Sequence, residues 1–423
     1  EFVGRLLVPR RDAIAPGGTG TMIRERSRGL KLAAITAAHG ATDGGAVFFL
    51  PLLPLVMGEL GLGALQAGVL VAVYNLTSSF LQLPLALLSD LSGKNRVFFA
   101  AGLALSGVVF IAFGHAQGYL SILLLMVLAG VGASTHHPQA VAILAEEFAD
   151  QRGFAIGCHG VGGSLGMSLY PLVTGVAALY MGWRQAIQLV ALPGLLVAVA
   201  VFVVLPERAP RPWSLRELAG NFRVGILQNR PLLLLLLTST FRIMGQKGIV
   251  VFIPLFASQV LGLGSGATGL LVSVFYGLGV LSQPVAGRLS DRHGRTLILS
   301  LLLAAGGLLT LAMTRVASPT GAFLVSGVLG FVLLAVRPVI HAEATELSRQ
   351  GLQSTTMGVI FGVNEGIASL SAVLGGWVAE AFGLKACFAF FALVLLGGAC
   401  LAMLLERVAP LPLPRPAGGA PRR

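Results

Sequence analysis

The chain has 423 residues, of which 55% are hydrophobic and only 11% are charged, and its mean hydropathy is +0.86. This composition excludes a soluble globular domain of this length and predicts a protein of the lipid bilayer. The net charge of +12 does not indicate a nucleic-acid partner, because the basic residues lie between long apolar runs rather than in one patch.

Apolar runs long enough to cross the hydrocarbon core recur along the whole chain. Twelve are centred on about 45, 78, 105, 130, 165, 194, 243, 277, 305, 333, 366 and 395. They predict an all-α membrane protein with twelve transmembrane helices. No small-residue cleavage site separates the arginine-rich start from the first run, so we expect no cleavable targeting segment.

The hydrophobic pattern breaks once for a long stretch, at residues 206–229, where prolines and arginines gather. This linker separates six predicted helices from six. The expected parts are a segment over 1–30, an N-terminal six-helix bundle over 31–205, the linker over 206–229, a C-terminal six-helix bundle over 230–405 and a tail over 406–423.

The distribution of basic residues predicts the orientation. If the N-terminus is cytoplasmic, 23 of the 29 lysines and arginines fall on that side, three fall on the other side and three lie within the membrane. The positive-inside rule therefore predicts that both termini are cytoplasmic.

A polar signature occurs twice, as Leu88-Ser89-Asp90-Leu91-Ser92-Gly93-Lys94 and as Leu289-Ser290-Asp291-Arg292-His293-Gly294-Arg295. Each copy interrupts apolar sequence between the second and third runs of its half. Repeated halves with the same charged hairpin are typical of duplicated membrane transporters, whose substrates bind between the two halves.

These features resemble the major facilitator superfamily, whose signature at this hairpin is Gly-x-x-x-Asp-Arg-x-Gly-Arg. The second copy, from Gly287 to Arg295, matches nearly completely. In the first copy Ala86 replaces the leading glycine and Leu91 replaces the arginine. The resemblance covers essentially the whole chain and implies two parallel six-helix bundles that move a small molecule by alternating access. Members of the superfamily commonly work as single chains, so a monomer is expected.

A narrower resemblance is to the fosmidomycin-resistance group of drug exporters. It is carried by three N-terminal motifs, which are His39 with Asp43, Gly130-Val-Gly132-Ala-Ser134-Thr-His136-His137-Pro138, and Gly160-Val-Gly162-Gly163-Ser164-Leu-Gly166. It implies export of drug-like compounds, while the C-terminal half resembles the group only at the level of the superfamily.

The duplicated hairpins are candidates for gating. The glycines at 93 and 294 permit a tight turn, and the aspartates at 90 and 291 can accept hydrogen bonds from a neighbouring helix N-terminus. Such contacts would latch one conformation, although a static topological anchor is the alternative. The residues assigned to gating are Asp90, Gly93, Lys94, Asp291, Arg292, Gly294 and Arg295.

Asp43 is the sharpest candidate for proton coupling, because a carboxylate in the middle of a membrane span is costly unless it is paired or protonated. His39 precedes it by one helical turn on the same face and can pair with it or relay its proton. A fixed hydrogen bond that only braces helices is the alternative. Glu343 and Glu365 are the proton-coupling candidates of the second half.

Five of the seven histidines precede the midpoint of the chain. A metal ion would need three or four converging ligands, and adjacent residues on a helix point about 100° apart, so His136 and His137 are not expected to face one site. We therefore predict no metal site and assign His137 and His159 to substrate binding.

The C-terminal half carries intramembrane cations, namely Arg242, Lys247 and Arg337, which are assigned to substrate binding together with Asn364. They could form a wall that attracts an anion such as a phosphonate or carboxylate, since guanidinium binds these groups in a bidentate way. Alternatively they could close as ion pairs with Glu343 and Glu365. The sequence does not decide between these arrangements.

The chain contains no phosphate-binding loop and no metalloprotease motif. No cofactor is expected, and the energy for transport would come from an ion or substrate gradient. The leading hypothesis is proton-coupled antiport of small drug-like or anionic compounds across the cytoplasmic membrane. A porter of metals or metal chelates that uses the histidines is the alternative, and a membrane enzyme acting on a lipid through His137, His159 and Asp43 is the hypothesis from a different class.

Overall fold

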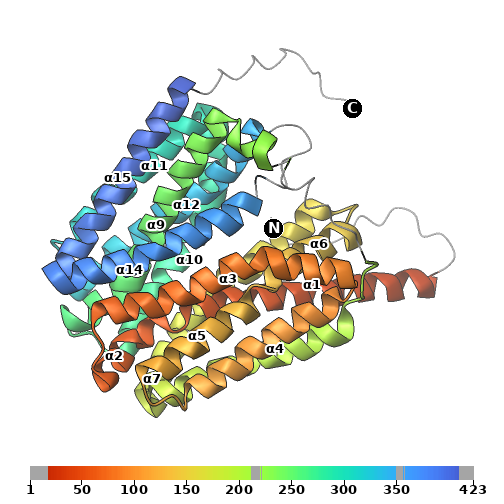
Figure 1. Cartoon of the computed structure of the whole chain (residues 1–423), viewed down its shortest axis with the longest axis horizontal. Helices are drawn as coiled ribbons and strands as arrows, with labels where there is room; N and C mark the ends of the chain where they lie inside the picture. Colours follow the sequence, from red (N-terminus) through yellow and green to blue (C-terminus); the bar gives the residue numbers. More distant parts are fainter. Residues whose placement is uncertain (1–17, 211–219, 221, 349–355, 357, 409–423) are drawn as a thin grey trace.

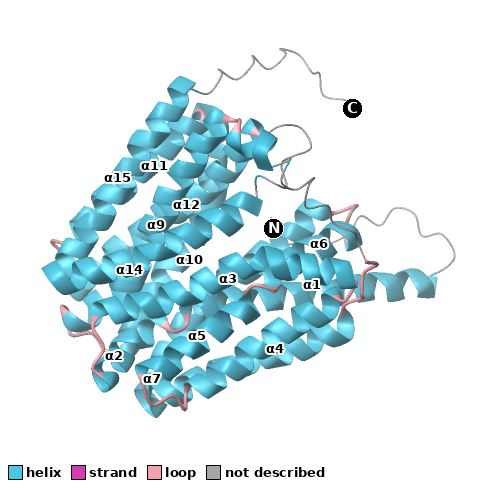
Figure 2. Cartoon of the chain, viewed as in Figure 1, coloured by secondary structure: helices cyan, strands magenta, loops and turns pink. Residues whose placement is uncertain are grey.

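The computed structural model describes residues 18–210, 222–348 and 358–408, together with residues 220 and 356. Within these residues the secondary structure is helical and no strand occurs (Figure 2). The first 17 residues, most of the predicted linker and the tail beyond residue 408 lie outside the described residues.

The N-terminal half runs from the first helix to residue 204 (Figure 1). Its elements are α1 (Gly18–Val47), η1 (Leu50–Leu52), α2 (Leu53–Leu60), α3 (Ala64–Ser92), α4 (Asn95–Phe113), α5 (Tyr119–Ala133), α6 (His136–Glu147) and α7 (Arg152–Val204). The first predicted span is interrupted by η1, where Pro51 and Pro54 remove backbone donors.

The C-terminal half begins with the short π-helix η2. Its elements are η2 (Arg223–Leu227), α9 (Arg230–Gln259), α10 (Ser265–His293), α11 (Arg295–Met313), α12 (Pro319–Leu347), η3 (Ile360–Asn364), α14 (Glu365–Phe382) and α15 (Leu384–Val408). The π-helix η3 continues directly into α14.

Ten helical segments in the described part of the chain are long and apolar enough to cross a membrane. One of them, α7, holds two spans, because Gly182 has φ +76° and the chain reverses there. Arg184, just after the turn, donates to the carbonyl of Ala116, which follows the end of α4. Leu205, at the end of α7, accepts from Arg96, which lies at the start of α4. The second span of α7 therefore runs back along the length of α4. With the 18-residue α14 as the remaining span, the prediction of twelve transmembrane helices is confirmed.

The two halves lie side by side and meet through small residues (Figure 1). Gly68 of α3 abuts the backbone of Ala372 in α14, and Gly175 of α7 abuts Gly269 of α10. Across the same junction Leu65 donates its backbone N–H to Glu380, and Ser168 donates to the carbonyl of Ser273. A side chain at these glycines would force the helices apart.

These contacts lie near the start of α3 and of α10 and near the end of α14. Because α1 and α2 together cross the membrane once before α3 begins, this junction lies on the membrane side opposite the start of α1 and the end of α15. We call it the far face, and we call the side where α1 starts and α15 ends the near face. The halves are thus joined at the far face.

Candidate functional site

Asp43 on α1 lies between two imidazole rings. His39, one helical turn earlier, places Nε2 3.1 Å from Asp43 Oδ2, and His137 on α6 places Nε2 3.5 Å from Asp43 Oδ1. The spacing of His39 and Asp43 therefore brings their side chains together as predicted. Whether this pair carries a proton stays a prediction.

Two further histidines complete a cluster with His39 and His137. The rings of His39 and His159 stack with centroids 3.9 Å apart, and those of His39 and His136 stack with centroids 5.2 Å apart. One nitrogen from each of the four rings lies within 4.8 Å of the others. The expectation that His136 and His137 cannot face one site was wrong, and the absence of a metal site is no longer a safe inference from their spacing.

The local backbone explains this convergence. The helix of the fourth span ends at Ala133 and restarts at His136, so both histidines fall in the first turn of α6 rather than in mid-helix. On α7, Gly162 and Gly163 let the helix approach α1 so closely that a Cβ on Gly163 would lie 2.7 Å from His39 Nε2 and from Asp43 Oδ2. The glycine-rich motif is thus what brings His159 against His39.

The second polar group lies on the C-terminal half. Lys247 on α9 places Nζ 2.6 Å from Glu365 Oε2 on α14, and the same ammonium donates to Asn75 Oδ1 on α3 at 2.9 Å. Asn75 in turn donates to the carbonyl of Val71. Lys247 therefore joins a carboxylate of its own half to an amide of the other half.

Glu365 has more than one cation around it. Arg242 is buried with 7% of its surface exposed, and Arg242 and Arg337 both act electrostatically on Glu365. Of the two arrangements left open by the sequence, ion pairing is realised for Lys247 with Glu365. Arg337 also acts on Asp43, so three cations and two carboxylates leave a smaller excess of positive charge here.

Asn364 and Glu365 lie where the π-helix η3 passes into α14. The wider π turn frees backbone groups and often marks a functional position. Asn364 is buried, and its Nδ2 donates to the carbonyl of Leu236 on α9 at 2.9 Å. Its donor is therefore used to join α9 to α14 beside Glu365.

Glu343 lies apart from this group. It is four residues from the end of α12, and the charges that act on it are those of Glu346 and Arg295 rather than those of Lys247 or Arg242. The expectation that it pairs with a central cation does not match this placement. It lies beside the C-terminal hairpin.

The hairpin of the N-terminal half binds the start of the linker. Asp90 accepts from the side chain of Asn95 at 3.0 Å and lies 3.6 Å from Arg208 Nη1. The same guanidinium makes two hydrogen bonds with Glu146, at 2.6 and 2.8 Å, and these raise the pKa of Arg208. Asp90 was expected to accept hydrogen bonds from a neighbouring helix N-terminus, and its donor Asn95 is the first residue of α4.

Gly93 turns this hairpin with φ +70°, and Lys94 follows as an exposed residue at the start of α4. In the C-terminal copy Gly294 has φ +95°, while Arg292 is exposed. Arg295 lies 3.0 Å from Asp291 and 2.6 Å from Glu346. Each network lies at the near face and is internal to its half, with Arg208 added to the first.

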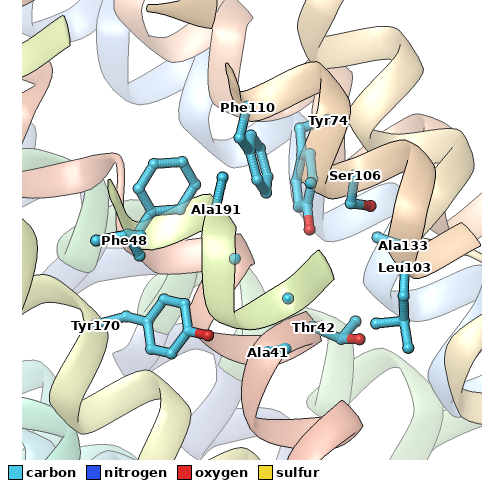
Figure 3. A pocket seen from close by; sticks show the side chains of 14 residues that line it. Ala41, Thr42, Phe48, Tyr74, Leu103, Ser106, Phe110, Ala133, Tyr170 and Ala191 are labelled. Atoms are coloured by element: carbon cyan, nitrogen blue, oxygen red, sulfur yellow. The ribbon is translucent and has the colours of Figure 1, made fainter. Parts of the chain in front are cut away.

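A small cavity of about 20 Å³ lies inside the N-terminal half, behind Asp43. The hydroxyl groups of Thr42, Tyr74, Ser106 and Tyr170 surround it (Figure 3). A space of this size holds about one water molecule and is far below the roughly 300 Å³ of a drug-sized site. The substrate must therefore bind elsewhere.

The sequence interpretation missed two residues of these polar networks, Asn75 and Arg208, and each left a signal. Asn75 is an amide inside an apolar span, where an uncharged polar side chain usually has a partner on another helix. Arg208 supplies the cation that the first hairpin lacks at Leu91. A search for a replacement arginine nearby would have led to the linker.

Comparison with known proteins identifies the family. The profile of the Major Facilitator Superfamily matches residues 35–372 and 235–423. The chain belongs to this superfamily. Among its relatives is the multidrug resistance protein MdtG of Escherichia fergusonii, with 28% identity over 86% of this chain and 91% of the relative. MdtG of Yersinia enterocolitica is 26% identical over 83% of this chain and 87% of the relative.

Solved structures show the same fold. A bacterial homologue of the human lysosomal transporter Spinster, described as inward-facing and unoccupied, has a TM-score of 0.78 at 16% identity and covers 90% of this chain and 97% of its own. The nucleoside transporter NupG has a TM-score of 0.76 at 12% identity, over 89% and 99% of the two chains. The superfamily prediction is thus confirmed, while the narrower fosmidomycin-resistance grouping stays a prediction.

Membership fixes the general activity. The chain is a multi-pass membrane protein and a secondary transporter, not an enzyme. The hypothesis of a membrane enzyme acting on a lipid is therefore dropped.

Proposed function

We propose that the protein is a proton-coupled transporter of small anionic or drug-like compounds that works by alternating access. The carrying observation is the position of Lys247, whose ammonium lies 2.6 Å from Glu365 and 2.9 Å from Asn75 of the other half. A cation shared between a carboxylate and the opposite half links the charge state of that carboxylate to the relative position of the halves.

The proposed coupling follows from the electrostatics of this contact. While Glu365 is ionised, it holds Lys247 and offsets its charge in a medium where an unpaired charge is costly. When Glu365 takes up a proton, Lys247 is released and the positive charge at the site grows. The site then binds an anion more tightly, so proton and anion bind together, which favours their transport in one direction rather than the antiport expected from the sequence.

The charge balance supports an anionic substrate. Arg242, Lys247 and Arg337 lie near two carboxylates among the described residues, because Arg337 acts electrostatically on Asp43 as well as on Glu365. A phosphonate or carboxylate would neutralise the excess through charge-assisted hydrogen bonds. The names of the MdtG relatives support export of drug-like compounds. His137, with its side chain 40% exposed, is the proposed contact from the N-terminal half.

The proposed location is the cytoplasmic membrane with both termini in the cytoplasm, which makes the near face cytoplasmic. Arg208 and Arg295 stand at this face, in agreement with the positive-inside rule. The far-face contacts would then close the route to the outside.

The test uses purified protein in liposomes with an imposed pH gradient and a trapped pH-sensitive dye. A panel of phosphonates, carboxylates and cationic drugs is added, and proton movement is recorded for each. We expect the anions to trigger proton movement in the wild type and Glu365→Gln to abolish it while still exchanging labelled substrate across the membrane.

The matched control is Glu406→Gln, because Glu406 is an exposed carboxylate near the end of α15. It should behave as the wild type. Proton movement that persists in Glu365→Gln would refute the coupling role of Glu365. A response only to cationic drugs would refute the assignment of an anionic substrate. The proton-carrying role predicted for Asp43 and His39 stays a separate prediction, compared in the same assay through Asp43→Asn.

A further inference from the structure

The histidine cluster has a feature that proton coupling through Glu365 does not use. His136 is 1% exposed, and neither of its ring nitrogens has a hydrogen-bond partner in the protein. His159 is 5% exposed, and its Nδ1 is likewise without a partner. Leaving such groups unpaired in the interior costs about 1–3 kcal/mol each, so their persistence needs an explanation.

The tautomer of His39 sharpens the point. Its Nδ1 lies 2.6 Å from the carbonyl oxygen of His159, a distance at which the nitrogen must donate its proton. In the neutral ring, Nε2 is then a bare lone pair. It lies 3.1 Å from an Asp43 carboxylate oxygen. A lone pair facing a carboxylate is repulsive, so this contact requires either a second proton on His39, which pairs it with Asp43 as an imidazolium, or a metal cation bound to Nε2.

We propose that His39, His136, His137 and His159 form a binding site for a transition-metal ion, with Zn²⁺ as the ion that suits four imidazoles. Neutral imidazole is a preferred ligand of zinc, and four ligands complete its tetrahedral shell. The four nitrogens already lie within 4.8 Å of one another. Zinc bonds of about 2.0–2.1 Å would place the four nitrogens about 3.3 Å apart, so the stacked rings of His39 and His159 must turn toward the ion when it binds.

The surroundings supply what a buried dication needs. Asp43 brings a negative charge against His39 and His137, which offsets part of the charge and orients both rings. The His159 carbonyl fixes the tautomer of His39. His137, whose side chain is 40% exposed, gives the ion a route of entry.

The position of the cluster favours a resident ion over a transported one. Its ligands come from α1, α6 and α7, all within the N-terminal half. A transported ion has to be released on both sides and therefore binds between the halves. An ion held inside one half instead ties three of its helices together. This inference is independent of the coupling role of Glu365, but it makes His137 a metal ligand in place of the substrate contact proposed above.

The test measures zinc binding rather than transport. The protein is prepared with an affinity tag that contains no histidine, treated with a chelator, dialysed against Zn²⁺ and analysed for metal. We expect one zinc ion per chain. Replacing zinc by Co²⁺ should give the intense visible absorption of a tetrahedral site, and Zn²⁺ should raise the melting temperature of the wild type, because an ion that binds the folded state stabilises it.

Two variants locate the site, and a third is the matched control. His136→Gln and His159→Gln should each weaken zinc binding by on the order of tenfold or more and abolish the thermal shift. His115→Gln should bind as the wild type, because His115 contacts Gln188 outside the cluster. Gel filtration and helical circular dichroism identify folded preparations. If one cluster variant does not fold, the other decides.

Three outcomes would overturn the proposal. Wild-type protein that retains no zinc after dialysis would show that the cluster holds no metal. Equal binding by the wild type and a folded cluster variant would place the ion elsewhere. Accumulation of zinc inside proteoliposomes would make the ion a substrate rather than a resident.

Discussion

The contact of α7 with α1 gives the sharpest prediction, through Gly163→Ala. A Cβ at this position would lie 2.6 Å from His39 Cε1, about 0.8 Å short of the 3.4 Å at which ordinary contact begins. His39 is 92% buried, and its Nδ1 is bound to the His159 carbonyl, so its ring has no free direction of retreat.

The expected cost is that of overpacking, about 1–3 kcal/mol, against a gain of up to about 1 kcal/mol from replacing glycine by alanine in a helix. The net effect is a loss of about 1–2 kcal/mol of stability. Gly160→Ala, on the same helix, is the control, because a Cβ at Gly160 would have no atom of another residue within 4 Å. It should be neutral or slightly stabilising.

The measurement is thermal unfolding of both variants in the same detergent. Gly163→Ala should melt several degrees below Gly160→Ala, and its affinity for zinc should fall because His39 is displaced. If the two variants melt together, the close approach of α7 to the His39 ring is not a constraint on the folded protein, and the argument from packing fails.

Three further predictions concern charged contacts. Lys247→Met leaves the partly buried Glu365 without its closest partner and should lower the free energy of unfolding by about 1–3 kcal/mol. The double variant Lys247→Met/Glu365→Met should recover most of this loss. If the losses in the double-mutant cycle are additive, the pair is not coupled. Arg208→Gln should slow transport with little change in substrate affinity, because it removes the cation that holds Asp90 and Glu146 at the near face. Arg223 is an exposed arginine of the linker, so Arg223→Gln should transport at the wild-type rate. Equal transport rates in the two variants would argue for a static anchor. Glu59→Gln should leave the melting temperature within about a degree of the wild type, because the Arg184–Glu59 ion pair is solvent-exposed. Trp183 can still donate its Nε1–H to the amide oxygen of the glutamine. A large drop in melting temperature would mean that this contact holds the turn at Gly182.

The fold could be predicted from the sequence because the signal is local. A run of apolar residues reports its own membrane span, and the two hairpins report the duplication. The same holds for His39 and Asp43, since residues four apart on a helix share a face whatever surrounds them. The prediction is weaker at Gly182, where two spans join with almost no polar sequence between them.

The rest of the site depends on contacts that no local pattern encodes. The approach of His159 to His39 requires the close contact of α1 with α7. Gly162 and Gly163 permit this contact, but glycines in a sequence do not predict which helix will pack against them. The contact of Lys247 with Asn75 depends on the relative position of the halves, which the sequence of either half leaves open.

The first hairpin shows how a motif can be lost while its chemistry is kept. Leu91 stands where the superfamily signature has arginine, and by sequence alone the N-terminal latch is incomplete. The structure places Arg208 in that role, 3.6 Å from Asp90 and bound in a bidentate way to Glu146. Because Arg208 lies at the start of the linker, this cation comes from outside the hairpin, whereas in the C-terminal half Arg295 keeps the contact within its own hairpin.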